Sequence, residues 1–273
     1  MDIARLEERL LEEELARWAE VRRVDVRRVP LPLRGPREAE AALVRPVSMY
    51  RAAYSAASYE AAGVFTVNSS RTIITAGDKV LAYAALASAK LPIPASYYAD
   101  SVEAAVEAGE ALGYPVVVKP AVGSWGRMVA RARSREKLEQ VARLRSFHPC
   151  GPVRASIVQE YVETGVRDIR CIVVDGRLLG CITRRAREGE WRSNVALGAN
   201  VEAFPADPQL EDLAVRAADA VGGFFVSIDL FETRDGYLVN EVNGVPEFKG
   251  FMRATGLNPA REVSLAMRRQ VKA

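Results

Sequence analysis

The strongest constraint on the fold is a pair of apolar segments near the C-terminus, residues 224–232 and 237–243, separated by a glycine-containing turn. Their runs of Phe, Val and Leu are typical of buried strands, so they predict a β-hairpin. Charged side chains within such strands need a partner or an ion. Glu241 and Asn243 lie two residues apart and share a face, and Asp229 on the paired strand can join them.

These three side chains form a hard ligand set made only of oxygen donors, two carboxylates and an amide. Such a set suits Mg²⁺ with nucleotide phosphates completing its shell. The hairpin therefore indicates phosphoryl-transfer chemistry. An alternative stays open at this point, in which Asp229, Glu241 and Asn243 are ordinary polar residues that keep an exposed hairpin soluble.

The composition of this 273-residue chain is ordinary for a globular protein, with 49% hydrophobic and 27% charged residues. No apolar stretch reaches the roughly 20 residues that span a bilayer, so we expect no membrane insertion and a cytoplasmic location. The net charge of +3 is too small to indicate nucleic-acid binding. It does fit an acidic substrate or protein partner.

The three cysteines form no zinc-binding pattern. Cys171 and Cys181 flank the turn Asp175-Gly176, but a two-residue loop places Cys181 opposite Arg170. The two sulfurs would then lie on opposite faces of the hairpin, so we expect reduced thiols. The single histidine, His148, lies in a Pro/Gly-bounded loop and supports no catalytic triad.

Hydrophobic periodicity and capping residues predict an α+β fold, in which hairpins of strands alternate with helices. The expected helices are 3–20, 51–62, 77–90, 100–113, 134–145 and 207–221, and the expected strands are 24–29, 42–47, 116–119, 128–130, 157–162, 170–174, 178–183, 225–232 and 237–242. The first part looks like a small α/β domain that opens on a helix. We therefore expect that its first strand is missing and that an upstream extension would stabilise it.

A second chemical signal is the loop Gly123-Ser124-Trp125-Gly126 between two strands, whose glycines allow backbone N–H groups to approach phosphates. It does not match the Walker A pattern and does not enter a helix. Lys119 ends the preceding apolar strand, where a phosphate oxygen would satisfy its ammonium group. The segment 159–162 could be an edge that meets adenine. A plain connecting loop and an ordinary strand end remain alternatives for these two segments.

Taken together, these segments resemble the ATP-grasp carboxylate–amine ligases of the RimK type. The resemblance covers about residue 40 to the C-terminus, and within that family 120–127 and Glu247-Phe248-Lys249 are similar to the LysX/ArgX group, which joins an amino acid to the carrier protein LysW. It implies an N-terminal domain over 1–75, a central subdomain over 76–150 and a C-terminal subdomain over 151–273.

The resemblance also implies roles for individual residues. ATP phosphates would meet Lys79, Lys119 and the loop residues Gly123, Ser124, Trp125 and Gly126; adenine would meet Glu160, Tyr161 and Val162; the ribose side would meet Asp168; the phosphate and acceptor end would carry Arg192, Ser193 and Asn194; and Mg²⁺ would be held by Asp229, Glu241 and Asn243. Arg170, Arg192 and Asn194 would be catalytic, with the two arginines holding an acyl phosphate and its tetrahedral oxyanion.

The reaction implied by the resemblance joins glutamate or α-aminoadipate to an acidic LysW-type carrier, and we expect a homo-oligomer. Leu197 and Gly244-Val245-Pro246 depart from the usual pattern near the acceptor pocket, so we expect both amino acids to react. One alternative is a RimK-like enzyme that adds glutamate to another protein. A second is a nucleic-acid-binding module built on the arginine-rich segments 131–145 and 184–187.

Overall fold

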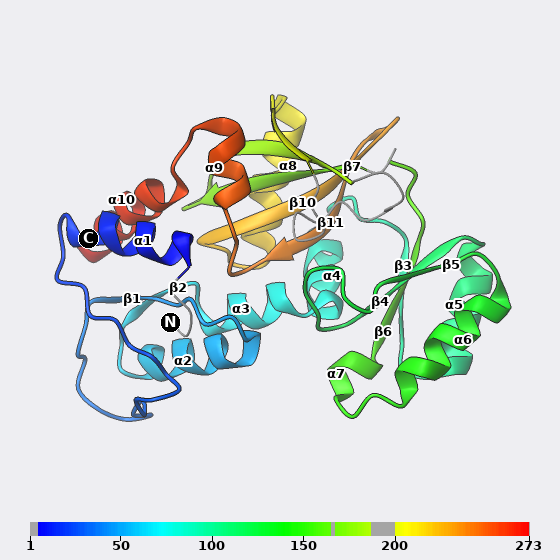
Figure 1. The fold of residues 1–273 in the computed structure, drawn as a ribbon, viewed down its shortest axis with the longest axis horizontal. Coiled ribbons are helices and arrows are strands. Elements are labelled where there is room, and N and C mark those ends of the chain that lie inside the picture. The colour runs from blue at the N-terminus through cyan, green and yellow to red at the C-terminus, as the bar shows by residue number, and fades with distance from the viewer. Residues whose placement is uncertain (1–4, 165–166, 187–199, 273) are drawn as a thin grey trace.

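A computed structural model describes residues 5–164, 167–186 and 200–272, and it shows the expected α+β architecture (Figure 1). In these residues the strands form two antiparallel sheets and one short parallel pair. The two larger sheets belong to separate lobes, each with its own helices. No helix in the described ranges combines the length and apolar character that a membrane crossing requires.

The larger sheet has the order β11-β10-β7-β8-β9, with every neighbouring pair antiparallel. Helix α8 covers one face, where its apolar side packs against the middle strands in the largest core cluster. The hairpin expected from the sequence is the pair β10 and β11. The bounds are β7 (Arg167–Val174), β8 (Arg177–Arg185), β9 (Asn200–Phe204), α8 (Pro208–Ala220), β10 (Phe225–Thr233) and β11 (Gly236–Asn243).

The second sheet has the order β3-β6-β4-β5 and packs against α5 and α6 in a separate core. Five of the expected elements lie here: α5, α6, β4, β5 and β6. Ser101 and Ser134 cap the two helices, and β4 is buried along its whole length. The bounds are β3 (Ser96–Ala99), α5 (Val102–Leu112), β4 (Val116–Pro120), β5 (Ala130–Ala132), α6 (Arg135–Ser146), α7 (Gly151–Arg154) and β6 (Ser156–Glu160).

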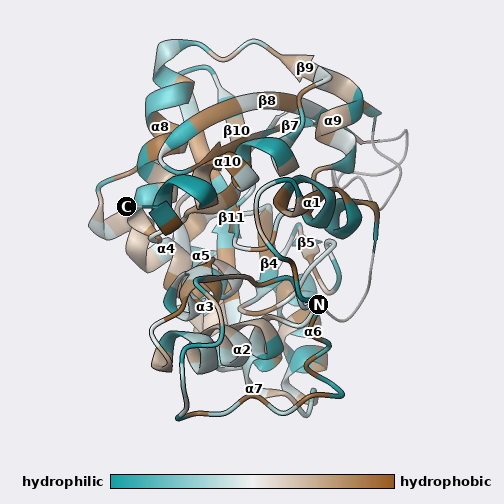
Figure 2. Cartoon of the chain, turned by 90° about the vertical axis from the view of Figure 1, so that its left-hand side faces the viewer, coloured by the Kyte–Doolittle hydropathy of each residue, from teal (hydrophilic) through white to brown (hydrophobic). Residues whose placement is uncertain are grey.

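The N-terminal part contains the parallel pair β1-β2 and several helices, and it packs closely on the C-terminal helices. Helix α1 lies against α10, and both join a core with Phe225 and Phe248 beneath the larger sheet. Figure 2 shows hydrophilic residues along the outer sides of α1, α8 and α10. The bounds are α1 (Leu6–Ala16), β1 (Ala41–Leu43), α2 (Met49–Ala61), β2 (Phe65–Val67), α3 (Ser70–Gly77), α4 (Lys79–Ser88), α9 (Lys249–Thr255) and α10 (Pro259–Lys272).

Several boundaries differ from the sequence-based expectations. The helix expected over 3–20 is shorter, and residues 24–29 are irregular rather than a strand. None of the sheets in the described part of the chain includes residues 24–29, so their β propensity alone does not make a strand. Helices α3, α7, α9 and α10 and strands β2, β3 and β9 were not expected. A missing first strand and the three domain boundaries stay predictions.

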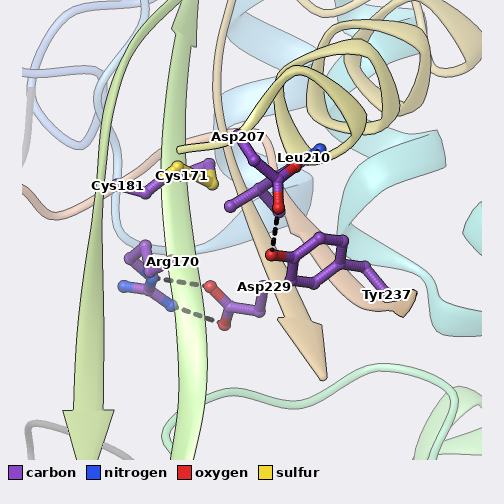
Figure 3. The surroundings of a disulfide bond; sticks show 7 residues. All are labelled: Arg170, Cys171, Cys181, Asp207, Leu210, Asp229 and Tyr237. Atoms are coloured by element: carbon purple, nitrogen blue, oxygen red, sulfur yellow. Dashed lines mark hydrogen bonds and ion pairs between the residues drawn. A yellow bond between two sulfur atoms is a disulfide. The ribbon is translucent and has the colours of Figure 1, made fainter. Parts of the chain in front are cut away.

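The expectation of reduced cysteines is wrong, because Cys171 and Cys181 form a disulfide between β7 and β8 (Figure 3). The turn itself is as expected, with positive φ at both Asp175 and Gly176. The register then shifts: Val173 pairs with Leu178, whereas Ile172 pairs with Gly180. One extra residue in β8 therefore brings the cysteines directly opposite each other on one face.

Candidate functional site

The candidate site is a cleft between the two larger sheets, with about 910 Å³ of empty space counted out to open solvent. Segments that lie far apart in the sequence meet here. The expected site residues that line it are Lys79, Lys119, Gly123, Ser124, Trp125, Gly126, Glu160, Tyr161, Val162, Asp168, Asp229 and Glu241.

Two buried lysines stand on the same side of the cleft. Lys79 is the first residue of α4, whose N-cap is Asp78. Its Nζ donates a hydrogen bond to the carbonyl of Gly123 at 3.0 Å and lies 3.2 Å from Glu241 Oε1. Lys119, near the end of β4, donates from Nζ to Asn240 Oδ1 at 2.7 Å. Both ammonium groups are therefore held beside the loop and the hairpin.

Burial lowers the pKa of Lys119 to about 8, with Lys79 adding to the decrease and the carboxylate of Glu241 opposing it. The group is 8% exposed and has an amide rather than a carboxylate as its hydrogen-bond partner. A desolvated cation of this kind gains stability when an anion enters the cleft. Its position therefore favours a phosphate-bearing ligand.

The loop after β4 has the backbone shape that its sequence suggested. Trp125, Gly126 and Met128 all have positive φ, at 57°, 66° and 58°. Such angles are uncommon for residues other than glycine, and they turn successive peptide groups of the loop in different directions. The guanidinium of Arg127 lies 4.8 Å from the centroid of the Trp125 ring, which fixes the tip of the loop.

Another edge of the cleft is formed by residues 160–162, which begin at the last residue of β6. Glu160 is tied to Ala95 twice, since its N–H donates to the Ala95 carbonyl at 2.9 Å and its Oε1 accepts from the Ala95 N–H at 2.7 Å. Arg131 lies over the ring of Tyr161 at 4.9 Å. This edge offers backbone groups and apolar surface to a planar ligand, while the Glu160 carboxylate is engaged by the protein itself.

A buried ion network lies at the end of the cleft on the larger sheet, and Figure 3 shows one of its pairs, Arg170 with Asp229. Arg170 donates to both oxygens of Asp229, at 2.7 and 2.8 Å, and Arg184 donates to the same carboxylate at 2.8 Å. Arg184 also donates to both oxygens of Asp168, at 2.7 and 2.6 Å. Burial acts to raise the pKa of Asp229, but the two arginines outweigh it and hold the pKa below its usual value.

Comparison with known proteins identifies the family. The RimK-like ATP-grasp domain matches residues 76–267. The chain belongs to the RimK-like ATP-grasp family. A glutamate–LysW ligase ArgX of Sulfurisphaera tokodaii is 44% identical over 96% of this chain and 94% of its own. An α-aminoadipate–LysW ligase LysX of Saccharolobus solfataricus is 38% identical over 80% of this chain and 79% of its own.

Among solved structures, a RimK domain ATP-grasp protein from Sphaerobacter thermophilus superimposes with a TM-score of 0.77. The two sequences are 27% identical, and the match covers 97% of this chain and 96% of the other. The likeness therefore extends over all the lobes, and it includes the N-terminal part that lies outside the matched domain. The expectation of a RimK-type ATP-grasp fold is confirmed.

Two oxygen donors that fit Mg²⁺, Asp229 and Glu241, line the ATP-grasp cleft, whereas the expected third ligand, Asn243, is not among its lining residues. Asp229 and Glu241 are directly paired across β10 and β11, and Asn243 pairs with Ser227 two residues further along. Among the described residues no three acidic, histidine or cysteine side chains form a metal-binding group, so a site here depends on the Asn243 amide. The Nδ2 of that amide is buried and has no hydrogen-bond partner within the described part. A rotated amide would offer its oxygen instead.

Arg184 and Asn240 also line the ATP-grasp cleft, although neither was among the site residues expected from the sequence. Arg184 belonged to the segment offered for nucleic-acid binding, but it is 2% exposed and ion-paired. Asn240 is the extra residue of a bulge, because Asp229 pairs with Glu241 and Leu230 with Val239. The bulge lets adjacent residues Asn240 and Glu241 both line the cleft. In β8, the buried residues Ile182 and Arg184 alternate with Thr183, so the strand pattern in the sequence could have indicated that Arg184 is buried. No local sequence signal marks the bulge at Asn240.

Three expected residues, Arg192, Ser193 and Asn194, lie outside the described residues, as does Leu197. Arg170 belongs to the buried ion network through its ion pair with Asp229. Both carboxylate oxygens of Asp168 accept hydrogen bonds from Arg184. The roles expected for these residues toward ribose, acyl phosphate and acceptor stay predictions.

Proposed function

We propose that this chain joins glutamate, and less efficiently α-aminoadipate, to the C-terminal glutamate of an acidic LysW-type carrier protein at the expense of ATP. Such a reaction belongs to arginine and lysine biosynthesis. The observation that carries the proposal is the 44% identity to a glutamate–LysW ligase across nearly the full length of both chains. The cleft supports it, because it brings two lysines, a loop with positive φ and a pair of carboxylates together.

Amide formation from a carboxylate requires activation, because the carboxylate is a poor electrophile. Transfer of the γ-phosphoryl group to the carrier carboxylate creates an acyl phosphate, and the α-amine of the amino acid then displaces phosphate. Lys79 and Lys119 would stabilise the phosphoryl oxygens, and Arg170 and Arg184, which contact Asp229, would offset negative charge that develops nearby. This route needs no nucleophilic side chain from the protein.

Asp229, Glu241 and Asn243 are the residues that would hold Mg²⁺. The ion supplies charge neutralisation between the nucleotide phosphates when it is bound. The protein prepares this site by burying Asp229 and by holding it with two arginines, so the carboxylate stays ionised. Arg170 would exchange at least one of its contacts when Asp229 turns toward a cation.

The preference for glutamate rests on the relatives. Two ArgX proteins match 96% of this chain at 44% and 41% identity, whereas the LysX proteins match at most 86% of it at 35–38%. The two amino acids differ by one methylene, which discriminates by only about 1–3 kcal/mol. We therefore propose that α-aminoadipate is a slower substrate rather than an excluded one.

The test uses purified enzyme, ATP, Mg²⁺ and a LysW-type carrier, with mass spectrometry to detect the modified carrier. We expect both amino acids to be joined, with kcat/KM higher for glutamate by less than about a thousandfold. Hydroxylamine in place of the amino acid should give the carrier hydroxamate, which reports the acyl phosphate. A carrier that lacks its last residue is the matched negative control.

A larger ratio between the two amino acids would contradict the acceptance of α-aminoadipate. No modification of the carrier with either amino acid would contradict the carrier assignment and favour glutamate addition to a different protein, as in RimK-like ligases. A cytoplasmic location and a homo-oligomeric state are part of this proposal, and sedimentation measurements test the second. Binding of nucleic acid or membrane is not part of it.

A further inference from the structure

Helix α6 buries an arginine at a position where its neighbours are apolar. Leu138, Ala142 and Arg145 form the inward stripe of this helix, with spacings of four and three residues. Arg145 is 3% exposed. Within the described part of the chain no carboxylate pairs with it, and burial alone lowers its pKa to about 10. The guanidinium is therefore charged near neutral pH, and it lies inside the lobe of the second sheet with no counter-ion among the described residues.

The contacts of Arg145 lead to both ends of the loop that lines the cleft. Nη2 donates to the carbonyl of Met128 at 2.6 Å, and Nη1 donates to Ser156 Oγ at 2.8 Å. Met128 ends the loop and has a positive φ of 58°. Ser156 is paired with Pro120, the residue at which β4 enters the loop. One guanidinium thus joins the entry and the exit of the segment 121–128.

The third nitrogen of this group is unused. Arg145 Nε is buried and has no hydrogen-bond partner in the described residues. A buried charge that has no counter-ion and an incomplete set of hydrogen bonds costs stability. An apolar residue would fill the stripe of α6 at lower cost, so the packing of the helix does not account for an arginine here. A ligand with negative charge on the other side of the loop would offset part of that cost.

We propose that Arg145 is a positioning residue for phosphate binding: it holds the two ends of the loop 121–128 in place and adds an unneutralised positive charge beneath it. The inference rests on the proposed nucleotide site, and it extends that site to a residue that does not line the cleft. Charge acts over longer distances in a protein interior than in water, so no direct contact with the nucleotide is required.

The experiment compares binding of a non-hydrolysable ATP analogue with binding of adenosine, by calorimetry in the presence of Mg²⁺. The dissociation constant of adenosine divided by that of the analogue isolates the part of the affinity that the phosphates supply. Arg145→Met should lower this ratio by about tenfold or more, because it removes the charge and both hydrogen bonds. Arg145→Lys should restore it to within about threefold of the wild-type value, because the charge remains.

Two further variants keep the test decisive. Arg143→Met removes the same charge from an exposed position on α6, and its ratio should stay within about twofold of wild type. Ser156→Ala removes one anchor with little risk to folding, and it should weaken binding of the analogue by about threefold while adenosine binding is unchanged. It supplies the answer if Arg145→Met does not fold.

An unchanged ratio in Arg145→Met, or an equal loss in Arg143→Met, overturns the inference. Equal weakening of adenosine and the analogue also overturns it, since that pattern reports general damage to the lobe. In the Ser156→Ala measurement, unchanged binding of the analogue overturns it. These measurements need neither carrier nor amino acid. Failure of the wild-type protein to bind the analogue would instead contradict the proposed function.

Discussion

At the residue scale, the cleft depends on charges that the protein leaves only partly neutralised. Lys119 is the clearest case, because its side chain is buried and bonded to the neutral amide of Asn240. Arg170 and Arg184, by contrast, are engaged by carboxylates. The two classes of cation should respond differently to pH, since arginine stays protonated throughout the accessible range.

Binding of the nucleotide should weaken as the pH rises through about 8, where Lys119 loses its proton. Below that pH the ammonium is charged and attracts phosphate; above it the amine is neutral. The test is the dissociation constant of the ATP analogue for the wild type and for Lys119→Arg. It is measured between about pH 7 and 9.5, which covers about one unit on either side of the transition. The variant should show a flatter profile, and identical profiles for the two proteins would contradict the assignment.

The same pKa decrease affects folding. The unfolded protein binds more protons than the folded one between pH 8 and the ordinary lysine value of 10.5, so Lys119 contributes stability that increases with pH over this window. The sign is opposite to that expected for nucleotide affinity. Loss of nucleotide binding at high pH is therefore not explained by unfolding at this site.

Glu241 and Asp229 should differ in their effect on stability although both are expected to hold the metal. Glu241→Gln should abolish ligation with little change in Tm, because its side chain is 28% exposed. Asp229→Ala leaves Arg170 and Arg184 buried without this partner, and it should cost about 3–5 kcal/mol of stability. Thermal unfolding and turnover of both variants check this, and a ligation rate near wild type in either would refute its role.

At the element scale, single-residue bulges decide which side chains meet. The extra residue in β8 brings Cys171 opposite Cys181, and the extra residue in β11 turns Asn240 into the cleft. Both bulges lie on strands that carry site residues. Strand β7 holds Arg170 next to Cys171, so the disulfide and the ion network are fixed by the same pairing of β7 with its neighbours.

Removing the disulfide should lower stability while retaining the fold. Cys171→Ala combined with Cys181→Ala opens a short loop, so the loss should be about 2–3 kcal/mol in the chain-entropy description. Cys150→Ala is the matched control, because that cysteine is free and exposed. Thermal unfolding of the three proteins checks the order. A double variant as stable as the control would show that the bond adds nothing beyond the pairing of the strands.

At the scale of the whole molecule, the N-terminal part and the C-terminal sheet share a core. Asn68 joins them with four hydrogen bonds: its Nδ2 donates to the carbonyls of Phe225 and Gly244, and its Oδ1 accepts from the N–H groups of Phe224 and Phe225. Arg45 donates to the carbonyl of Pro246. The loop expected to face the acceptor is therefore held from the N-terminal side.

Asn68→Ala should destabilise the protein by about 2–4 kcal/mol, since it leaves buried backbone groups of two segments unpaired. It should also raise the KM for the amino acid more than the KM for ATP, because Asn68 holds Gly244 in the expected acceptor loop after β11 and does not itself line the cleft. Steady-state kinetics and thermal unfolding measure both effects. Equal changes in the two KM values would show that the contact acts on stability alone.

The sequence by itself determined the local parts of this protein. The hairpin 225–243, the buried strand that ends near Lys119, the glycine loop and the capped helices α5 and α6 were all expected, because each depends on residues close together in the chain. The resemblance to RimK-type ligases also followed from the order of these segments. Spacing and periodicity carry such information directly.

Only the tertiary structure decided the register of the strands and the partners of the charges. At Gly180, beside the bulge in β8, a side chain would meet Phe251 of α9, about seventy residues away in the chain, at 3.3 Å. Arg184 meets Asp229 and Arg145 meets Met128 through packing of distant elements. A one-residue shift reverses the face of every following side chain, and the energy that selects it comes from contacts outside the strand. Local sequence therefore could not specify these pairings.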